Sequence, residues 1–192
     1  MGGSRPFWRQ RVATGIADYA PAVVNDYAGF VSGVFASAPA GWILHGSRSG
    51  GAGVSTDAEF RSTAHFATVE PSQLGWNATV GDDVVALHMT SRQWGWNARN
   101  CSPRYIGYEF AQSTEAEPIV DGQVRAFCWL LQRDREVWPT MPLVFKTHAE
   151  VDGTAEYGGF VDGKTDVFHK GSGLADELRR RIQARLAELG VT

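Results

Sequence analysis

One hairpin-like segment constrains the fold of this chain more than any other feature. Trp76 to Val80 and Val84 to Met89 are apolar runs joined by the turn Gly81-Asp82, a pattern typical of two antiparallel strands. Other short apolar runs also indicate strands. They are Gly41–Leu44, Tyr105–Ala111 and Leu143–Thr147. Strands and helices alternate along the chain, yet the hairpin requires some antiparallel pairing. We therefore predict an α/β fold, with a mixed central β-sheet flanked by helices.

Helical periodicity, with apolar residues spaced by three and four positions, recurs in several segments. Thr56-Asp57-Ala58-Glu59 is a capping box that opens the second of them. The last segment carries a leucine and isoleucine stripe, and its arginines are expected to be largely solvated: Arg179, Arg180, Arg181 and Arg185. The predicted helices are Pro21 to about Phe35, Thr56 to about Val69, one that begins at Asp121, and one from Ser172 to Gly190.

No internal repeat and no linker divides the sequence. We therefore predict a single domain over residues 1–192. It comprises an N-terminal helical extension over residues 1–40, a core over 41–172 and a C-terminal helix over 172–190.

The charge balance argues against some classes of partner. Lys and Arg number 18 against 21 Asp and Glu, so the net charge is −3 and nucleic acid is not an expected partner. No apolar run reaches the length of a membrane span. N-terminal arginines precede apolar residues, but Asp18 and Asp26 interrupt what would have to be an apolar signal region. We therefore expect no signal peptide.

Some reactive side chains lack any motif around them. Cys101 and Cys128 do not form a disulfide framework or a Cys-x-x-Cys, and we expect both to be buried as small apolar residues. His65 and His88 are interpreted as structural.

Candidate metal ligands follow the predicted strands. His45 ends the first apolar run, and His148 ends the last one. Asp166 comes later, two residues after Lys164, and an extended segment would place both on one side. Catalytic zinc sites use three ligands drawn from these residue types and leave one position open. Taken singly, each histidine is more often structural and Asp166 more often a turn residue, so only their combination indicates a metal site.

The order of the motifs is more specific than any one of them. The motifs are Trp42-Ile43-Leu44-His45-Gly46, Trp94-Gly95-Trp96-Asn97-Ala98, Ile106-Gly107-Tyr108-Glu109, Leu143 to His148, and Lys164-Thr165-Asp166. Over about residues 41 to 172, the chain resembles the type-2 N-acetylmuramoyl-L-alanine amidases, which share a fold with peptidoglycan-recognition proteins. Among these it is most similar to the catalytic domains of bacteriophage endolysins.

The resemblance implies a role for each motif residue. His45, His148 and Asp166 would bind Zn²⁺, which acidifies water towards neutral pH. Glu109 would be the base that activates or orients that water. Its apolar strand would desolvate the carboxylate and raise its proton affinity, which suits proton transfer to the leaving amine. Lys164 would place positive charge where a tetrahedral intermediate becomes negative.

The sequence also departs from the family. Gly46 stands where many members have a second histidine, and Asn97 stands where many have a histidine. The segment after the second predicted ligand is longer than in compact members, so Glu150 stays within reach as an alternative ligand. His169 competes with Asp166 in the same way.

Further residues are predicted to line a groove for glycan and peptide. Aromatic faces stack on sugar rings, and arginine pairs with peptide carboxylates. The residues are Trp94, Trp96, Asn97, Arg48 and Arg99. The tryptophans have an alternative role, which is to hold their loop against the core.

Three functions remain open. The first is a zinc amidase that cuts bacterial peptidoglycan between N-acetylmuramic acid and L-alanine. The second is a peptidoglycan-binding module that does not cut, although such a module needs neither Glu109 nor Lys164. The third is a zinc peptidase that cuts within the stem peptide. We expect a monomer whose partner is peptidoglycan, made in the host cytoplasm and acting on the wall after release.

Overall fold

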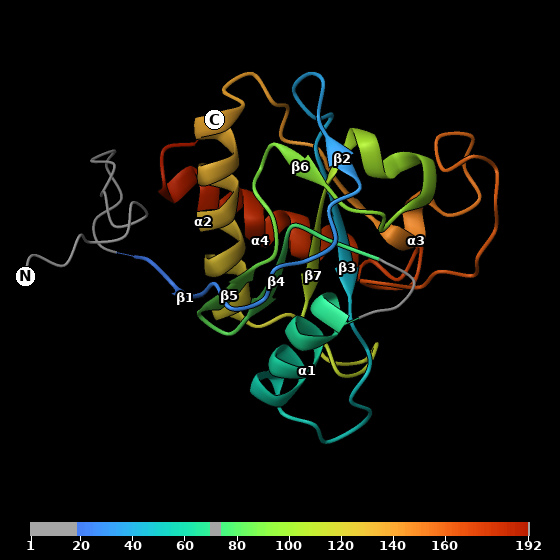
Figure 1. The fold of residues 1–192 in the computed structure, drawn as a ribbon. Helices are drawn as coiled ribbons and strands as arrows, with labels where there is room; N and C mark the ends of the chain where they lie inside the picture. Colours follow the sequence, from blue (N-terminus) through green and yellow to red (C-terminus); the bar gives the residue numbers. More distant parts are fainter. Residues whose placement is uncertain (1–18, 70–73, 192) are drawn as a thin grey trace, which may run out of the picture.

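The computed structural model describes residues 19–69 and 74–191, and a mixed six-stranded sheet lies at its centre (Figure 1). The strands are β1 (Ala22–Val24), β3 (Trp42–Gly46), β4 (Ala78–Gly81), β5 (Val84–Leu87), β7 (Ile106–Phe110) and β8 (Phe145–Thr147). Their order is β1-β5-β4-β7-β3-β8. Only β4 and β5 pair in the antiparallel sense, and the other neighbours are parallel. The predicted hairpin and mixed sheet are confirmed.

The predicted helix over Pro21 to about Phe35 is wrong. β1 pairs with β5, while β2 (Gly33–Val34) pairs with β6 (Gln93–Trp94) in a separate antiparallel ribbon. β-branched valines fit strands as well as helices, and here an unpaired edge of β5 decides between them. A Cβ on Gly33 would touch the Trp94 ring, so this close approach requires glycine. Residues 1–18 of the predicted helical extension lie outside the described residues.

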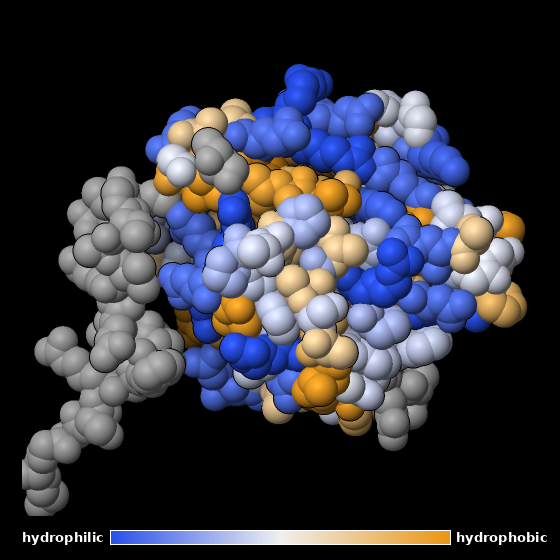
Figure 2. Space-filling model, turned by 90° about the horizontal axis from the view of Figure 1, so that it is seen from above, coloured by the Kyte–Doolittle hydropathy of each residue, from blue (hydrophilic) through white to orange (hydrophobic). Residues whose placement is uncertain are grey.

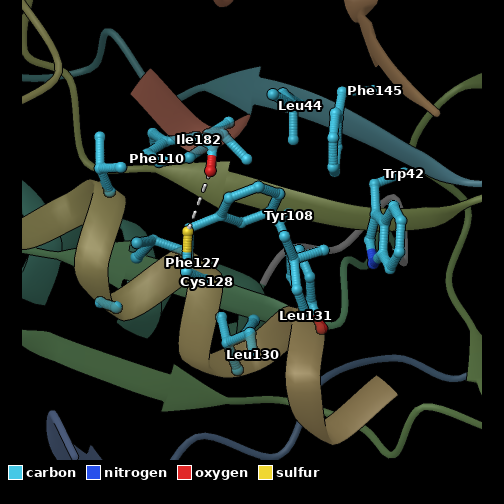
Figure 3. Packing of buried hydrophobic residues seen from close by; sticks show 14 of the residues in the cluster. Trp42, Leu44, Tyr108, Phe110, Phe127, Cys128, Leu130, Leu131, Phe145 and Ile182 are labelled. Carbon is cyan, nitrogen blue, oxygen red and sulfur yellow. Dashed lines mark hydrogen bonds between the residues drawn. The ribbon is translucent and has the colours of Figure 1, made fainter. Parts of the chain in front are cut away.

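One face of the sheet is covered by α2 (Asp121–Val137) and α4 (Leu174–Glu188), the last two long helices of the chain. Figure 3 shows α2 side chains, among them Phe127 and Leu131, packed against strand residues such as Tyr108. Cys128 is buried in the same layer, and its Sγ lies 3.9 Å from the Ile182 carbonyl. Cys101 is also a buried free thiol, so the prediction for both cysteines is confirmed.

The surface of α4 differs in part from its prediction. Leu178, Ile182 and Leu186 of the apolar stripe are buried as expected. Arg180 is largely exposed, but three other arginines are mostly covered and ion-paired, so full solvation is wrong for them. The reason is that carboxylates lie within reach, two of them on other segments and one on α4 itself. The three pairs are Arg179 with Glu150, Arg181 with Asp121, and Arg185 with Glu188.

The opposite face is covered by α1 (Thr56–Val69), the 3-10 helix η2 (Arg99–Arg104) and α3 (His148–Val151). The predicted α1 is confirmed, but its capping box is wrong. Ser55 Oγ accepts the hydrogen bond from Ala58 N at 3.3 Å, one residue earlier than expected. Glu59 is fully buried instead and accepts hydrogen bonds from Ser47 and Ser49.

The outer surface is of mixed polarity. Figure 2, seen from above, shows a band of hydrophobic residues with hydrophilic residues around it. Large exposed apolar side chains come from several elements and include Val34, Phe66, Trp96 and Val161. Over residues 19–69 and 74–191, no helix combines the length and apolar character needed to cross a membrane.

Candidate metal centre and its cleft

Strand alternation places His45 and Glu109 on the same face of the sheet. The residues before and after them in β3 and β7, such as Leu44 and Tyr108, pack in the α2 layer. His45 and Glu109 therefore face the layer of α1 and α3, because successive strand side chains alternate. They are direct partners in the parallel register of β3 with β7. This register brings an imidazole and a carboxylate together at the carboxyl ends of two central strands.

His148 and Asp166 are brought to the same edge by local hydrogen bonds. Thr147 caps α3: its Oγ1 accepts from Glu150 N at 3.3 Å, and Glu150 Oε2 accepts from Thr147 N at 2.8 Å. This capping box fixes His148 as the first residue of α3. Ala149 N then donates to the Asp166 carbonyl at 2.7 Å, which ties the later loop to the start of the helix.

The potential ligand atoms form a small triangle. His45 Nδ1 lies 3.0 Å from His148 Nδ1 and 3.4 Å from Asp166 Oδ2. His148 Nδ1 lies 3.2 Å from the same oxygen. Ligands about 2.0 Å from a tetrahedral zinc ion are about 3.3 Å from one another, so this triangle has the size of one face of such a site. His45, His148 and Asp166 could therefore hold a metal ion.

The electrostatics of the triangle suit metal binding. Burial, together with the neighbouring His148, lowers the pKa of His45 to about 4. Burial alone would raise the pKa of Asp166, but hydrogen bonding to His148 and His45 outweighs it and holds that pKa below its usual range. A neutral imidazole and an ionised carboxylate are the forms that ligate metals. His45 Nε2 is buried and has no hydrogen-bond partner among the described residues.

Glu109 and Lys164 line the same cleft, whose volume is about 430 Å³. Glu109 is only 9% exposed. Burial raises the pKa of Glu109 well above its usual value; the negative charge of Asp166 adds to this, and Lys164 opposes it. No hydrogen bond from the described residues reaches the Glu109 carboxylate, which leaves it available to a bound molecule.

The predicted groove residues divide into two groups. Arg48 and Asn97 line the cleft, whereas Trp94, Trp96 and Arg99 do not. Trp94 packs against the core from β6, as the alternative role predicts, whereas Trp96 is exposed.

Arg48 and Arg99 are both engaged within the protein. Arg48 donates to Thr165 and to the Val167 carbonyl, the latter at 2.8 Å, and so braces the segment that carries Asp166. Arg99 forms an ion pair with Asp162.

The alternative ligands lie outside the triangle. Glu150 is used in the cap of α3 and in its ion pair with Arg179. His169 is exposed over 62% of its side chain and faces Glu115 at 2.7 Å. His88 is buried and hydrogen-bonded to Thr79 and to the Tyr27 carbonyl, as a structural histidine would be.

Gly46 and Asn97, the two positions that differ from the motifs the sequence resembles, both lie at the cleft. Next to Gly46 the space that a Cβ would enter is occupied by the end of the Gln112 side chain, so a larger residue there requires Gln112 to move. The Asn97 side chain lies against Gly107, on the strand that carries Glu109, and donates to the Gly75 carbonyl at 3.2 Å. Its Oδ1 is buried without a partner at the edge of the cleft.

The sequence analysis missed several residues of the cleft. Ser47 and Ser49 follow His45 directly, and the buried Glu59 holds this loop in place. The signal in the sequence that could have revealed them is the polar run Ser47-Arg48-Ser49 close after the candidate ligand His45. The remaining missed residues lie on α1 or in the segment before β4, and they are Ser62, Thr63, Phe66, Leu74 and Trp76.

Comparison with solved structures identifies the fold. The catalytic domain of XlyA has a TM-score of 0.54 at 17% identity, over 83% of this chain and 98% of that one. The hydrolase AmiA of Staphylococcus aureus has a TM-score of 0.54 at 13% identity, over 88% and 87%. The endolysin N-acetylmuramoyl-L-alanine amidase LysCS of Clostridium intestinale has 0.50 at 14%, over 70% and 86%. No protein-family model matches the sequence, and no curated protein does. The expected fold is thus confirmed by structure alone.

Proposed function

We propose that this chain is a zinc-dependent N-acetylmuramoyl-L-alanine amidase that hydrolyses the amide between N-acetylmuramic acid and L-alanine in peptidoglycan. The observation that carries the proposal is the triangle of His45, His148 and Asp166 beside the buried carboxylate of Glu109. The fold is shared with a solved enzyme that is named as such an amidase.

The ligand set matches the composition of catalytic zinc sites. Two imidazoles and one carboxylate leave a coordination position open, unlike the closed four-ligand sets of structural sites. A bound zinc ion would acidify water and polarise the scissile carbonyl. His45, His148 and Asp166, which line the cleft, would hold the ion.

Glu109 and Lys164 divide the remaining chemistry between them. Glu109, with its raised pKa, accepts a proton from the attacking water and passes it to the leaving nitrogen. Lys164 is exposed, and no carboxylate within the described ranges pairs with its Nζ. Lys164 lines the cleft, and its ammonium would stabilise the negative oxygen that develops on the carbonyl.

The walls of the cleft suit an amphiphilic substrate. Phe66 and Trp76 stack with ring centroids 6.4 Å apart, and Leu74 extends this apolar wall. Ser47 and Ser49 line the cleft close to His45. A glycan with attached peptide presents apolar ring faces, which suit the aromatic wall, and hydroxyl and amide groups, which suit the serine side of the cleft.

The test is turnover of purified peptidoglycan, monitored by quantifying new free amino groups and by mass spectrometry of the released fragments. We expect release of peptides that begin with L-alanine, loss of release after chelation, and recovery when Zn²⁺ is added back. Full activity in the metal-free protein would refute the proposal. Fragments cut inside the stem peptide would indicate a peptidase, and binding without new amines would indicate a recognition module.

A further inference from the structure

A hydrogen-bonded chain runs from the surface to the back of His148. His148 Nε2 lies 3.0 Å from Tyr157 Oη, and Tyr157 Oη lies 2.7 Å from Asp162 Oδ2. Arg99 then holds both oxygens of Asp162, with Nε at 2.6 Å and Nη2 at 2.8 Å. His148 therefore has one ring nitrogen towards the metal triangle and the other in this chain.

The charges in the chain fix the direction of each hydrogen bond. The two-point contact with Arg99, together with the Tyr157 hydroxyl, lowers the pKa of Asp162, so its carboxylate is ionised and can only accept. Tyr157 must then donate its proton to Asp162. The lone pairs of the Tyr157 oxygen remain for His148, whose Nε2 must carry the hydrogen for this contact to form. His148 Nδ1 then carries the lone pair that a metal requires. The Asp166 carboxylate, whose Oδ2 lies 3.2 Å from Nδ1, favours a hydrogen on that nitrogen when no metal is bound, so the Tyr157 oxygen competes with Asp166 for the position of the ring hydrogen.

This tautomer is the one that a metal requires. A histidine that donates its outer N–H to an acceptor is held in one tautomer and one ring orientation, which raises metal affinity. The acceptor is usually a carboxylate or a carbonyl; here a tyrosine oxygen backed by a carboxylate takes that place.

Packing contacts hold the side chains of this hydrogen-bonded series in place. Tyr157 is only 1% exposed and packs with Ile43 and Cys101 behind the sheet. The Arg99 guanidinium lies 4.5 Å from the ring centroid of Phe160. A side chain fixed by packing on one side and hydrogen bonds on the other can position its neighbour.

The same loop is braced on its outer side. The Asp152 carboxylate accepts from Asp162 N at 2.7 Å and from Lys164 N at 2.9 Å. The segment that orients His148 is therefore also the segment that presents Lys164 to the cleft. The segment over 149–163 therefore supports the candidate metal site in two ways: through Tyr157 and Asp162 behind His148, and through Asp152, which holds the backbone of Lys164.

We propose that Tyr157, backed by Asp162 and Arg99, is a positioning residue that holds His148 in its Nε2–H tautomer and thereby sets the metal affinity of the site. The inference rests on the proposed function, because it concerns the same His45, His148 and Asp166. It also reassigns Arg99 from substrate contact to support of the metal site.

The test uses the full-length chain with two readouts that need no substrate. The first is the long-range nitrogen–proton NMR correlation of the His148 ring in metal-free protein. The second is Zn²⁺ affinity measured by competition with a chromophoric chelator. In Tyr157→Phe we expect a mixture of His148 tautomers and an affinity about 10- to 100-fold lower.

Tyr105→Phe is the matched control. Tyr105 belongs to the same apolar cluster, but its hydroxyl donates to Glu156 at 2.8 Å. We expect wild-type tautomer and wild-type affinity in that variant. Equal losses in both variants, or no change in Tyr157→Phe, would overturn the inference.

If Tyr157→Phe does not fold, Asp162→Ala carries the test. It removes the acceptor at the outer end of the chain, and we expect the same direction of change in both readouts; unchanged readouts would overturn the inference. Because neither readout involves hydrolysis, a wild-type protein that binds zinc but cuts no peptidoglycan would refute only the proposed activity.

Discussion

Asp134 and Glu109 are both buried carboxylates, one on each side of the central sheet, and their surroundings differ. Asp134 lies in the α2 layer and accepts hydrogen bonds from Trp42 Nε1, Tyr108 Oη and Ser91 Oγ at 2.7, 2.7 and 2.5 Å. Glu109 lies in the layer of α1 and α3 and accepts none from the described residues. Burial raises the pKa of both groups, to about 6 for Asp134 and well above the usual value for Glu109.

The difference separates structural from reactive carboxylates. A buried acceptor with three donors is fully satisfied and joins α2 to strands β3 and β7. A buried acceptor with an open cleft before it keeps its lone pairs for a substrate or a water molecule. A shifted pKa alone therefore does not distinguish the two carboxylates, whereas their hydrogen bonds do, and the unpaired state of Glu109 among the described residues supports the catalytic role proposed for it.

The largest expected effect is on activity at Glu109. We expect Glu109→Gln to lower turnover of peptidoglycan by about 10²- to 10⁴-fold, because the amide cannot transfer a proton. Its zinc content and melting temperature should stay close to those of the wild type. Glu188→Gln is the control, since Glu188 is exposed and forms an ion pair with Arg185 away from the cleft. Near-normal turnover in Glu109→Gln would remove that residue from the mechanism.

The next effect is on stability at Asp134. Asp134→Ala leaves two buried donors, Trp42 Nε1 and Tyr108 Oη, and the partly buried Ser91 Oγ without this acceptor. Each buried donor left unpaired costs about 1–3 kcal/mol. We expect a loss of about 3 kcal/mol or more in the free energy of unfolding, measured by urea denaturation. Activity per folded molecule should be unchanged, because the residue lies across the sheet from the cleft. A stable variant with low turnover would contradict the separation of the two faces.

The sequence predicts the face of Glu109 but not the partners of Asp134. Apolar runs around His45 and Glu109 set the alternation of β3 and β7, so both side chains are placed by period two alone. Asp134 reads as one polar residue in an amphipathic helix. Its three donors come from separate segments, and their meeting depends on how α2 lies across the sheet.

The same limit explains the wrong helix at Pro21–Phe35 and why the contact of Tyr157 with His148 was not predicted. Apolar residues spaced by three and four suit a helix locally, and only pairing with the distant strands β5 and β6 turns parts of this segment into β1 and β2. Tyr157 reaches His148 because Arg99, far away in sequence, holds the loop through Asp162. Contacts that depend on packing between distant segments leave no local periodicity.

The smallest expected effect is the pH dependence of stability that comes from Asp134. Its pKa is about 6 in the folded protein, against 3.8 as the ordinary value. Between these values the folded state binds more protons than the unfolded state, so the contribution of Asp134 to stability falls as pH rises from about 4 to about 6 and is level above that. The three hydrogen-bond donors favour the ionised form and so offset part of the effect of burial on the pKa. We therefore expect the free energy of unfolding to change by on the order of 1–3 kcal/mol over this pH range.

Asp134→Asn isolates this contribution, because an amide does not titrate while one oxygen still accepts a hydrogen bond. The measurement is urea unfolding of both metal-free proteins at several pH values from 4 to 7. The stability of the wild type relative to Asp134→Asn should decrease across that range and then become constant. A difference that is flat or rises with pH would mean that the three donors outweigh burial, and that Asp134 is an ordinary ionised carboxylate despite its position in the core.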